Sequence, residues 1–190
     1  MKLWLARHAQ PLIASGICYG VSDVTADEDM TLQAAEALAK VLPPHTLCRA
    51  SPLQRCQQLA AALQQIRPDL SITPSTYSNE CTDARLAEMD FGHYEGRPWA
   101  DIAKADVDAW TSNFGNHRFG GQESANEVLQ RVAQALQDNK TRQAENLLWI
   151  THAGVIRAAM LLAQGVSQVE TAEQWPHEVP SFGGFTQLVF

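Results

Sequence analysis

The sequence lacks long hydrophobic runs, paired cysteines and an excess of basic residues. No stretch approaches about 18 uninterrupted apolar residues, so no transmembrane helix is expected. The four cysteines show no CxxC spacing and no neighbouring histidine pattern, which argues against a zinc site and against a disulfide framework. The formal net charge of −7 at pH 7 argues against a protein that binds nucleic acid through a basic face.

The remaining composition is that of an ordinary globular protein. Of 190 residues, 45% are hydrophobic and 18% are charged, and a chain of this length typically forms one domain. No linker, internal repeat or low-complexity segment interrupts it, so a single domain is expected over residues 1–190. The apolar run after Met1 is too short for the core of a signal peptide, which favours a cytoplasmic location.

Strands and helices are predicted to alternate along the chain. Strands are predicted at residues 2–6, 47–50, 70–73, 147–151 and 185–190. Helices are predicted at residues 31–42, 52–67, 99–105, 107–113, 124–136 and 155–163. Thr31 and Ser51 are the expected N-caps of the first two helices, with Pro52 at the first helical position of the second. The alternation predicts an α/β protein, a three-layer αβα sandwich whose mostly parallel central sheet carries helices on both faces.

Two histidines occupy similar settings near opposite ends of the sequence. His8 follows Arg7 and the first apolar strand, and His152 follows the apolar strand at 147–151. Because the carboxyl ends of parallel strands meet at one edge of a sheet, both histidines are expected there. Two histidines beside an arginine suit an anionic group and nucleophilic chemistry. The helix predicted from residue 155 would add backbone N–H groups, and Ala153, just before it, is a candidate binding residue.

Other charged residues could complete such a site. Arg55 lies about one turn into the helix predicted after Ser51, and its planar guanidinium can bind two oxygens of a phosphate at once. Glu88 and Glu95 lie in a segment without helical or strand periodicity, as is typical of a loop that lines a site. Glu88 is the preferred proton donor, but spacing alone does not decide between the two carboxylates.

Five motifs follow one another in a fixed order. They are Arg7-His8, Ser51-Pro52-Leu53-x-Arg55, Leu86-x-Glu88-x-x-Phe91-Gly92-x-x-Glu95-Gly96, Gly120-Gly121-x-Glu123-Ser124 and Thr151-His152-Ala153-Gly154-Val155-Ile156-Arg157. Together they resemble the histidine phosphatase superfamily, the phosphoglycerate-mutase-like proteins, over nearly the whole chain. The resemblance implies hydrolysis of a phosphomonoester without a metal or any other cofactor.

The resemblance also implies a two-step covalent mechanism. His8 would attack phosphorus in line and become phosphohistidine. Arg7, Arg55 and His152 would bind the phosphoryl oxygens and stabilise the charge of the transition state. Glu88 stands at the general-acid position of the family's Leu-x-Glu motif, so it would protonate the leaving oxygen and then act as base toward water.

The segment after His8 departs from the family's pattern. Many members have Arg-His-Gly-Glu-Thr followed by an asparagine, whereas this chain has Ala9-Gln10-Pro11 and then Ala14 at the asparagine position. A threonine and an asparagine are therefore missing from the oxygen-binding edge of the pattern. Gln10, Ser15 and Tyr19 are candidates to replace their contacts to the substrate. Lower activity or a differently shaped substrate would be compatible with this change, and the intact Arg-His pair argues against an inactive enzyme.

The expected partner is a small phosphorylated metabolite, and several specific functions stay open. One alternative is a non-catalytic module that binds a phosphorylated ligand. A phosphoglycerate mutase is another, although only about thirty residues separate Arg55 from Leu86, too few for the inserted segment of relatives with that activity. Among phosphatases, the Arg-His-Ala start is similar to that of alpha-ribazole phosphatases of cobalamin assembly. A phosphatase acting on many small metabolites is equally compatible.

The loops at residues 10–30, 90–120 and 170–183 are expected to form the rim of the pocket. Candidates to touch the leaving group are Trp99, Trp110, Phe114, His117, Arg118 and Trp175. For Trp99 and Trp110, packing of a helix against the core is the favoured interpretation. The sequence does not predict the oligomeric state.

Overall fold

A computed structural model of the chain describes residues 1–70, 81–141 and 144–190. Its centre is a four-stranded sheet in the order β2-β3-β1-β4. The strands are β1 (Lys2–Arg7), β2 (Leu47–Ala50), β3 (Asn146–Thr151) and β4 (Phe185–Val189). β1, β2 and β3 are parallel, and β4 runs antiparallel to β1. The sheet is therefore mostly parallel, as predicted.

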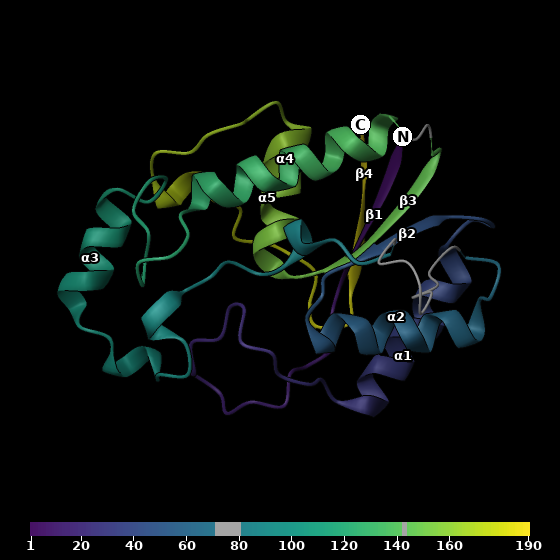
Figure 1. Ribbon diagram of the computed structural model, residues 1–190, viewed down its shortest axis with the longest axis horizontal. Helices are drawn as coiled ribbons and strands as arrows, with labels where there is room; N and C mark the ends of the chain where they lie inside the picture. Colours follow the sequence, from purple (N-terminus) through teal and green to yellow (C-terminus); the bar gives the residue numbers. More distant parts are fainter. Residues whose placement is uncertain (71–80, 142–143) are drawn as a thin grey trace.

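The helices are α1 (Glu28–Val41), α2 (Gln54–Ile66), α3 (Lys104–Ser112), α4 (Ala125–Thr141) and α5 (Ala153–Ala163). Helices α1 and α2 cover one face of this sheet, α4 and α5 cover the other, and α3 lies apart from both layers (Figure 1). Side chains alternate between the faces of a strand. Ala6 and Ile150 accordingly belong to the core under α1 and α2, whereas Leu5 and Trp149 belong to the core under α4 and α5. The three-layer αβα architecture is confirmed.

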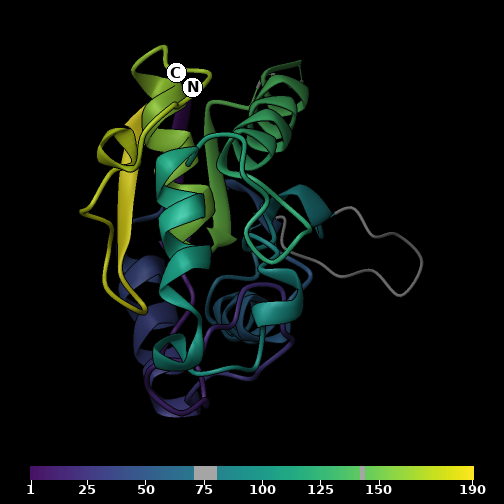
Figure 2. The ribbon, with the colours of Figure 1, turned by 90° about the vertical axis from the view of Figure 1, so that its left-hand side faces the viewer.

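The carboxyl ends of the parallel strands face α3 and the long loops. In Figure 1 the strands run toward the centre of the view, and α3 lies beyond them on the left. The perpendicular view shows β4 at one side of the molecule and α3 crossing in front of the sheet (Figure 2). Arg7 pairs with Thr151 at the ends of β1 and β3. This register places His8 and His152, the next residues along each strand, side by side at one edge of the sheet.

The first helix begins earlier than predicted. α1 starts at Glu28, and Asp27 is its N-cap, with a carboxylate that accepts a hydrogen bond from the backbone N–H of Met30 at 2.8 Å. The prediction of Thr31 as N-cap is therefore wrong. Thr31 lies inside the first turn, where its hydroxyl donates to the carbonyl of Asp27 at 2.6 Å. A carboxylate that accepts from a free N–H outcompetes the threonine hydroxyl further along the chain.

The second helix also begins in a different way. α2 starts at Gln54, so the predicted N-cap Ser51 and the predicted first helical residue Pro52 both lie before it. A residue distant in sequence caps the helix instead, because the backbone N–H of Gln54 donates to Asp23 at 2.7 Å. The Ser51 hydroxyl is thereby available for a contact with His152, described below.

Smaller differences concern other segments. In place of helices at residues 99–105 and 107–113, the structure has a short 3₁₀ helix at Trp99–Asp101 followed by α3. α5 begins at Ala153, two residues before its predicted start. The strand predicted at 70–73 lies almost entirely outside the described residues. Within the described parts of the chain, no helix combines the length and apolarity needed to cross a membrane.

Candidate active site

The two histidines singled out from the sequence lie next to each other. Their ring centroids are 5.0 Å apart, and the side chains are almost fully buried. The backbone N–H of His8 donates to the carbonyl of Thr151 at 3.1 Å, which continues the β1–β3 pairing by one residue. The parallel sheet thus joins two positions that are far apart in the sequence.

One hydrogen bond fixes the tautomer of His8. Its Nδ1 lies 2.7 Å from the carbonyl oxygen of Ala9, and a carbonyl can only accept, so Nδ1 carries a proton. Burial, together with the nearby positive charges of Arg55 and Arg7, lowers the pKa of His8 to about 3, against the opposing effect of the bond to Ala9. The ring is therefore neutral at pH 7, and Nε2 carries the lone pair.

Arg7 is held against the C-terminal loop. Its Nη1 donates to the carbonyl of Pro180 at 3.1 Å, and its guanidinium carbon lies 3.9 Å from the centroid of the Phe182 ring. The same ring lies 5.5 Å from that of His8. Sequence reasoning expected this loop at the rim but did not single out Phe182, because no local pattern marks an aromatic residue that contacts β1 from a distant loop.

Arg55 is completely buried and held by a different loop. Its Nη1 donates to the carbonyl of Ser22 at 2.7 Å, and its Nη2 donates to the carbonyl of Gly20 at 2.6 Å. The guanidinium carbon lies 5.6 Å from the centroid of the Tyr19 ring. Tyr19, a predicted binding residue, is therefore beside Arg55, and burial raises the pKa of its phenol.

Glu95 organises the loop that holds Arg55. Its carboxylate accepts hydrogen bonds from the backbone N–H groups of Val21 at 2.9 Å, Ser22 at 2.6 Å and Phe91 at 3.1 Å, and also from the Ser22 hydroxyl. These bonds occupy both carboxylate oxygens. Glu95 therefore has a structural role in ordering this loop, and the assignment of Glu88 as proton donor stays a prediction.

Glu88 follows the short 3₁₀ helix Ala84–Leu86, and its carboxylate lies beside the first turn of α5. The backbone N–H of Gly154 is 3.1 Å and 3.2 Å from its two carboxylate oxygens. Its charge acts on the pKa values of Arg7, Tyr19 and Arg157, which places it among these side chains. A negative group at a helix N-terminus is favourably placed with respect to the helix dipole.

Sequence reasoning missed the residue that holds the Glu88 segment in place. Arg131 of α4 donates to the backbone carbonyls of Arg85 at 2.6 Å, Ala87 at 2.8 Å and Glu88 at 3.2 Å. It also forms an ion pair with Glu123 at 2.6 Å. An arginine on an amphipathic helix has no sequence signal for such contacts, since its partners are loop carbonyls more than forty residues away.

The His152 ring contacts Ser51, directly after β2, and Cys56 of α2. Its Nε2 lies 2.7 Å from the Ser51 hydroxyl and 3.4 Å from the Cys56 thiol, and burial raises the pKa of that thiol. Burial also lowers the pKa of His152 well below its usual value, and the positive charges of Arg55, Arg131 and Arg7 act in the same direction. His152 is therefore neutral at pH 7.

Three buried nitrogen atoms of this cluster lack a partner. They are Nε of Arg7, Nε of Arg55 and Nδ1 of His152, none of which has a hydrogen bond to a described residue. Buried polar atoms are nearly always paired, so such a concentration in one place is unusual. All three residues were predicted from the sequence to bind phosphoryl oxygens.

The remaining predicted binding residues lie at different distances from the cluster. Ala153 is the first residue of α5, directly after His152. Gln10 is exposed, and its carbonyl accepts from the backbone N–H of Asp27 at 2.8 Å. The structure places Gln10 at the surface after β1 and shows no hydrogen bond of its side chain to the cluster among the described residues.

Some of the rim residues predicted to meet a leaving group do lie beside Glu88. Trp110, Phe114 and Trp175 line a cavity of about 210 Å³ together with Glu88. Trp99 does not line it and packs parallel to Phe119, with ring centroids 5.8 Å apart. His117 is partly buried and is also absent from this cavity lining.

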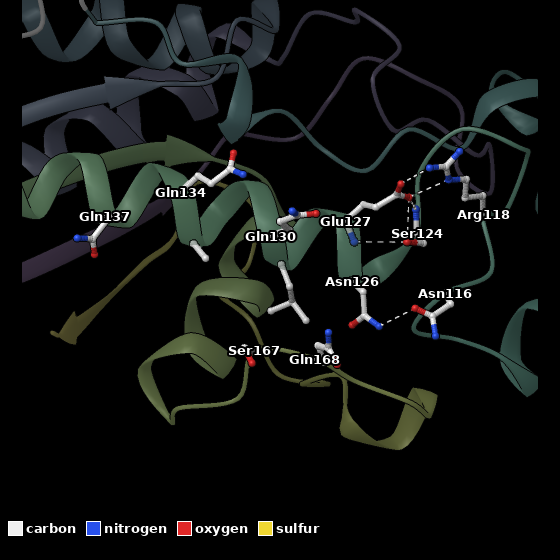
Figure 3. A pocket seen from close by; sticks show the side chains of 12 residues that line it. Asn116, Arg118, Ser124, Asn126, Glu127, Gln130, Gln134, Gln137, Ser167 and Gln168 are labelled. Carbon is white, nitrogen blue, oxygen red and sulfur yellow. Dashed lines mark hydrogen bonds and ion pairs between the residues drawn. The ribbon is translucent and has the colours of Figure 1, made fainter.

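Arg118 belongs to another part of the surface. It forms an ion pair with Glu127 of α4, and Glu127 also accepts from the backbone and hydroxyl of Ser124. These residues line a groove of about 830 Å³ along α4, together with several glutamine and asparagine side chains (Figure 3). The groove is larger than the cavity beside Glu88 but shares none of the buried histidine and arginine side chains described above.

Comparison with known proteins identifies the family of this chain. The family description of the histidine phosphatase superfamily (branch 1) matches residues 3–182. A protein of Hydrogenobacter thermophilus provisionally named phosphoserine phosphatase 2 is 30% identical over 176 residues, covering 87% of this chain and 79% of the relative. The chain belongs to the histidine phosphatase superfamily.

Solved structures show the same fold. The native structure of a mycobacterial glucosyl-3-phosphoglycerate phosphatase is 21% identical, with a TM-score of 0.79, covering 98% of this chain and 88% of the other. A complex of that phosphatase with inorganic phosphate is 20% identical, with a TM-score of 0.77, covering 99% and 89% of the two chains. Both superpositions cover almost the whole of this chain, which agrees with the αβα architecture.

Proposed function

We propose that the chain is a single-domain cytoplasmic phosphomonoester hydrolase that acts on a small phosphorylated metabolite through a phosphohistidine on His8. The observation that carries this proposal is the state of the His8 ring. Nδ1 is committed to the Ala9 carbonyl and the ring is neutral, so Nε2 presents a lone pair beside Arg7 and Arg55. A neutral imidazole flanked by positive charge suits a nucleophile that attacks an anionic phosphoryl group.

The phosphoryl group is proposed to bind where the unpaired nitrogens gather. Arg7, Arg55 and His152 each hold a buried nitrogen without a protein partner, and arginine N–H groups match the oxygens of a phosphate. The start of α5 at Ala153 contributes the positive end of a helix dipole. Tyr19 lies over Arg55 and is proposed to contact the substrate from the side of the Gly20–Ser22 loop.

The proposed reaction has two steps. In the first, Nε2 of His8 forms a bond to phosphorus while the ester P–O bond breaks, and protonated Glu88 gives its proton to the leaving alcohol oxygen. In the second, Glu88 takes a proton from water, the oxygen of that water attacks phosphorus, and the P–N bond to His8 breaks. Inorganic phosphate is released, and Glu88 is protonated again for the next turnover. Arg7 and Arg55 stabilise the negative charge on the equatorial oxygens in both steps.

The first test is hydrolysis of p-nitrophenyl phosphate with and without EDTA. The wild-type protein is compared with His8→Ala and with His177→Ala, a matched substitution of an exposed histidine. We expect EDTA-resistant turnover that persists in His177→Ala and falls at least about a thousand-fold in His8→Ala. Turnover that survives in His8→Ala, or that EDTA abolishes, would contradict the proposed mechanism.

Ligand binding and the fate of the phosphoryl group separate the alternatives. A binding module would hold inorganic phosphate or vanadate but release no product from any monoester. A phosphoglycerate mutase would transfer the phosphoryl group to 3-phosphoglycerate or 2-phosphoglycerate rather than to water. A screen of monoesters that includes phosphoserine, glucosyl-3-phosphoglycerate and alpha-ribazole 5′-phosphate ranks the substrates suggested by the relatives and by the start of the sequence.

A further inference from the structure

The cavity beside Glu88 has an unusually apolar wall for a pocket next to charged groups. It has a volume of about 210 Å³. Its lining combines Glu88, the backbone of Gly154 and Arg157 with five apolar side chains: Met89, Phe91, Trp110, Phe114 and Trp175. Glu88 and Arg157 are the two charged side chains among the described residues that line it.

The aromatic rings of this wall support one another. Phe91 meets Trp110 edge to face with centroids 6.2 Å apart, and Trp110 packs parallel to Phe114 at 5.5 Å. Phe114 in turn meets Trp175 edge to face at 5.7 Å. These residues come from α3, from the loops on either side of it and from the segment after α5. Interlocked rings of this kind keep their orientation, so the cavity has a defined shape before a ligand enters.

Arg157 is fixed at the edge of the same cavity. It lies on α5, one turn beyond Gly154, and its Nε donates to the carbonyl of Pro176 at 2.7 Å. This bond ties α5 to the segment that carries Trp175. The planar face of a guanidinium stacks on flat rings. Although Arg157 is charged, it is therefore compatible with an apolar, planar ligand in the cavity.

We propose that this cavity binds the organic part of the substrate, and that the preferred substrates are phosphomonoesters whose alcohol carries an uncharged group about the size of one aromatic ring. The inference rests on the proposed function, because Glu88 is the group that would protonate the leaving oxygen. Glu88 lines this cavity, so a leaving alcohol that takes its proton from Glu88 would lie at the edge of the cavity. An engineered apolar cavity of about 150 Å³ accommodates benzene, so this one has room for a single ring with a short linker.

A strongly polar leaving group fits the cavity less well. A sugar or an amino acid would place hydroxyl, ammonium or carboxylate groups against Met89 and the aromatic rings, where few protein atoms can replace their bonds to water. Burying polar groups without partners is unfavourable. The aromatic wall thus predicts discrimination by the organic part of the substrate, while the phosphate group itself is common to all candidates.

The experiment compares two non-hydrolysable ligands that differ only in the ring, 3-phenylpropylphosphonate and propylphosphonate. Their dissociation constants are measured by calorimetry with the wild-type protein. Transfer of one ring to an apolar site predicts tighter binding of the phenyl compound by about 10- to 100-fold. Equal binding of the two compounds would overturn the proposal.

Variants connect this preference to the cavity. Trp175→Ala removes part of the wall and is expected to reduce the preference to about threefold or less, while propylphosphonate binds as before. Phe185→Ala removes another partly buried aromatic side chain, which packs on Trp4 at the opposite face of the sheet, and should keep the preference. If Trp175→Ala fails to fold, Phe91→Leu serves the same purpose. A preference that survives removal of the wall would also overturn the proposal.

Turnover of 3-phenylpropyl phosphate and propyl phosphate completes the test. The two alcohols have similar acidity, so a difference in kcat/KM reports the cavity rather than the chemistry of the leaving group. Hydrolysis of both esters at equal rates would contradict the cavity while leaving the phosphatase proposal intact. A clear preference in binding without hydrolysis of either ester would support the cavity and contradict the phosphatase proposal.

Discussion

The backbone N–H of Gly154 faces both carboxylate oxygens of Glu88, at 3.1 Å and 3.2 Å. The contact is so close that a Cβ atom at position 154 would lie 2.2 Å from Oε1 of Glu88. Glycine is therefore needed here to leave Glu88 in this position, and not for the backbone conformation, because Gly154 is the second residue of α5 and has no left-handed conformation.

Substitution Gly154→Ala should separate activity from stability. Alanine is favoured over glycine in a helix by about 1 kcal/mol, so the free energy of unfolding should be unchanged or higher. The methyl group displaces the flexible end of Glu88, and we expect kcat to fall by about 10- to 100-fold. Kinetics together with urea unfolding check both parts. Vanadate should bind as before, since Arg7 and Arg55 are untouched; a full kcat would show that Glu88 does not act from this position.

Arg131 is expected to act through Glu88 without touching the substrate. Arg131→Gln removes the ion pair with Glu123 and the cationic donor to three backbone carbonyls. We expect kcat to fall by about tenfold or more with little change in KM, and a loss of stability of about 1–3 kcal/mol.

The matched control for Arg131 is Arg118→Gln. Arg118 forms an ion pair with Glu127, which lies on α4 as Arg131 does. This pair is largely exposed and lines the groove along α4. Exposed ion pairs contribute about 0–1 kcal/mol, so both stability and kcat should stay near wild type. Equal kinetic effects of the two substitutions would argue against a positioning role for Arg131.

The two carboxylates Glu88 and Glu95 should differ in kinetic behaviour. Glu88→Gln removes the proposed proton donor, so kcat for an alkyl phosphate should fall about 10²- to 10⁴-fold. The loss should be smaller for p-nitrophenyl phosphate, whose leaving group needs little protonation. Inhibition by inorganic phosphate should be nearly unchanged.

Glu95→Gln should mainly weaken phosphate binding. Its carboxylate orders the Val21–Ser22 backbone, and the carbonyls of that loop hold Arg55. We expect the inhibition constant for phosphate to rise by about tenfold, with a smaller change in kcat for alkyl phosphates. The opposite pattern in the two variants would reverse the assignment of the carboxylates.

The neutral state of buried His8 should make the protein less stable in acid. The pKa of His8 is about 3 in the folded protein and about 6.5 in an unfolded chain. Between these values the unfolded chain binds more protons, so the free energy of unfolding falls as the pH is lowered from about 6.5 toward 3. His8→Asn removes this contribution.

Urea unfolding at pH 7.5, 6, 5 and 4 measures the effect. Wild type should lose on the order of 3 kcal/mol more than His8→Asn between pH 7.5 and 4. The low pKa of His152 acts in the same direction, but its main cause is burial, which both proteins share, so most of its contribution cancels in the difference. Parallel pH profiles would mean that His8 is not held neutral in the folded state.

The fold could be predicted because its signals are local. The apolar runs at residues 2–6 and 147–151 and the helical spacing after Ser124 depend only on neighbouring residues and on the periods of strand and helix. Helix starts were less predictable. Asp23 caps α2 from a distant loop, and no residue near Gln54 in the sequence indicates that this contact forms.

In the candidate site, too, some residues are marked by a local pattern and others are distinguished only by the folded structure. His8, Arg55, Glu88 and His152 stand out because each follows a recognisable strand end or motif. Glu88 and Glu95 cannot be separated by sequence, since what distinguishes them is which backbone N–H groups reach each carboxylate. That property exists only after the chain has folded.

The sequence by itself therefore determined the αβα architecture, the convergence of two histidines at one sheet edge and the membership of a phosphatase superfamily. The tertiary structure decided the neutral tautomer of His8, the support of Glu88 by Arg131 and the aromatic cavity beside it. The physical reason is the separation in sequence of the residues that produce each feature. Periodicity and strand ends depend on a few neighbouring residues, whereas burial, hydrogen-bond partners and cavity walls are made by residues that meet only when distant segments pack together.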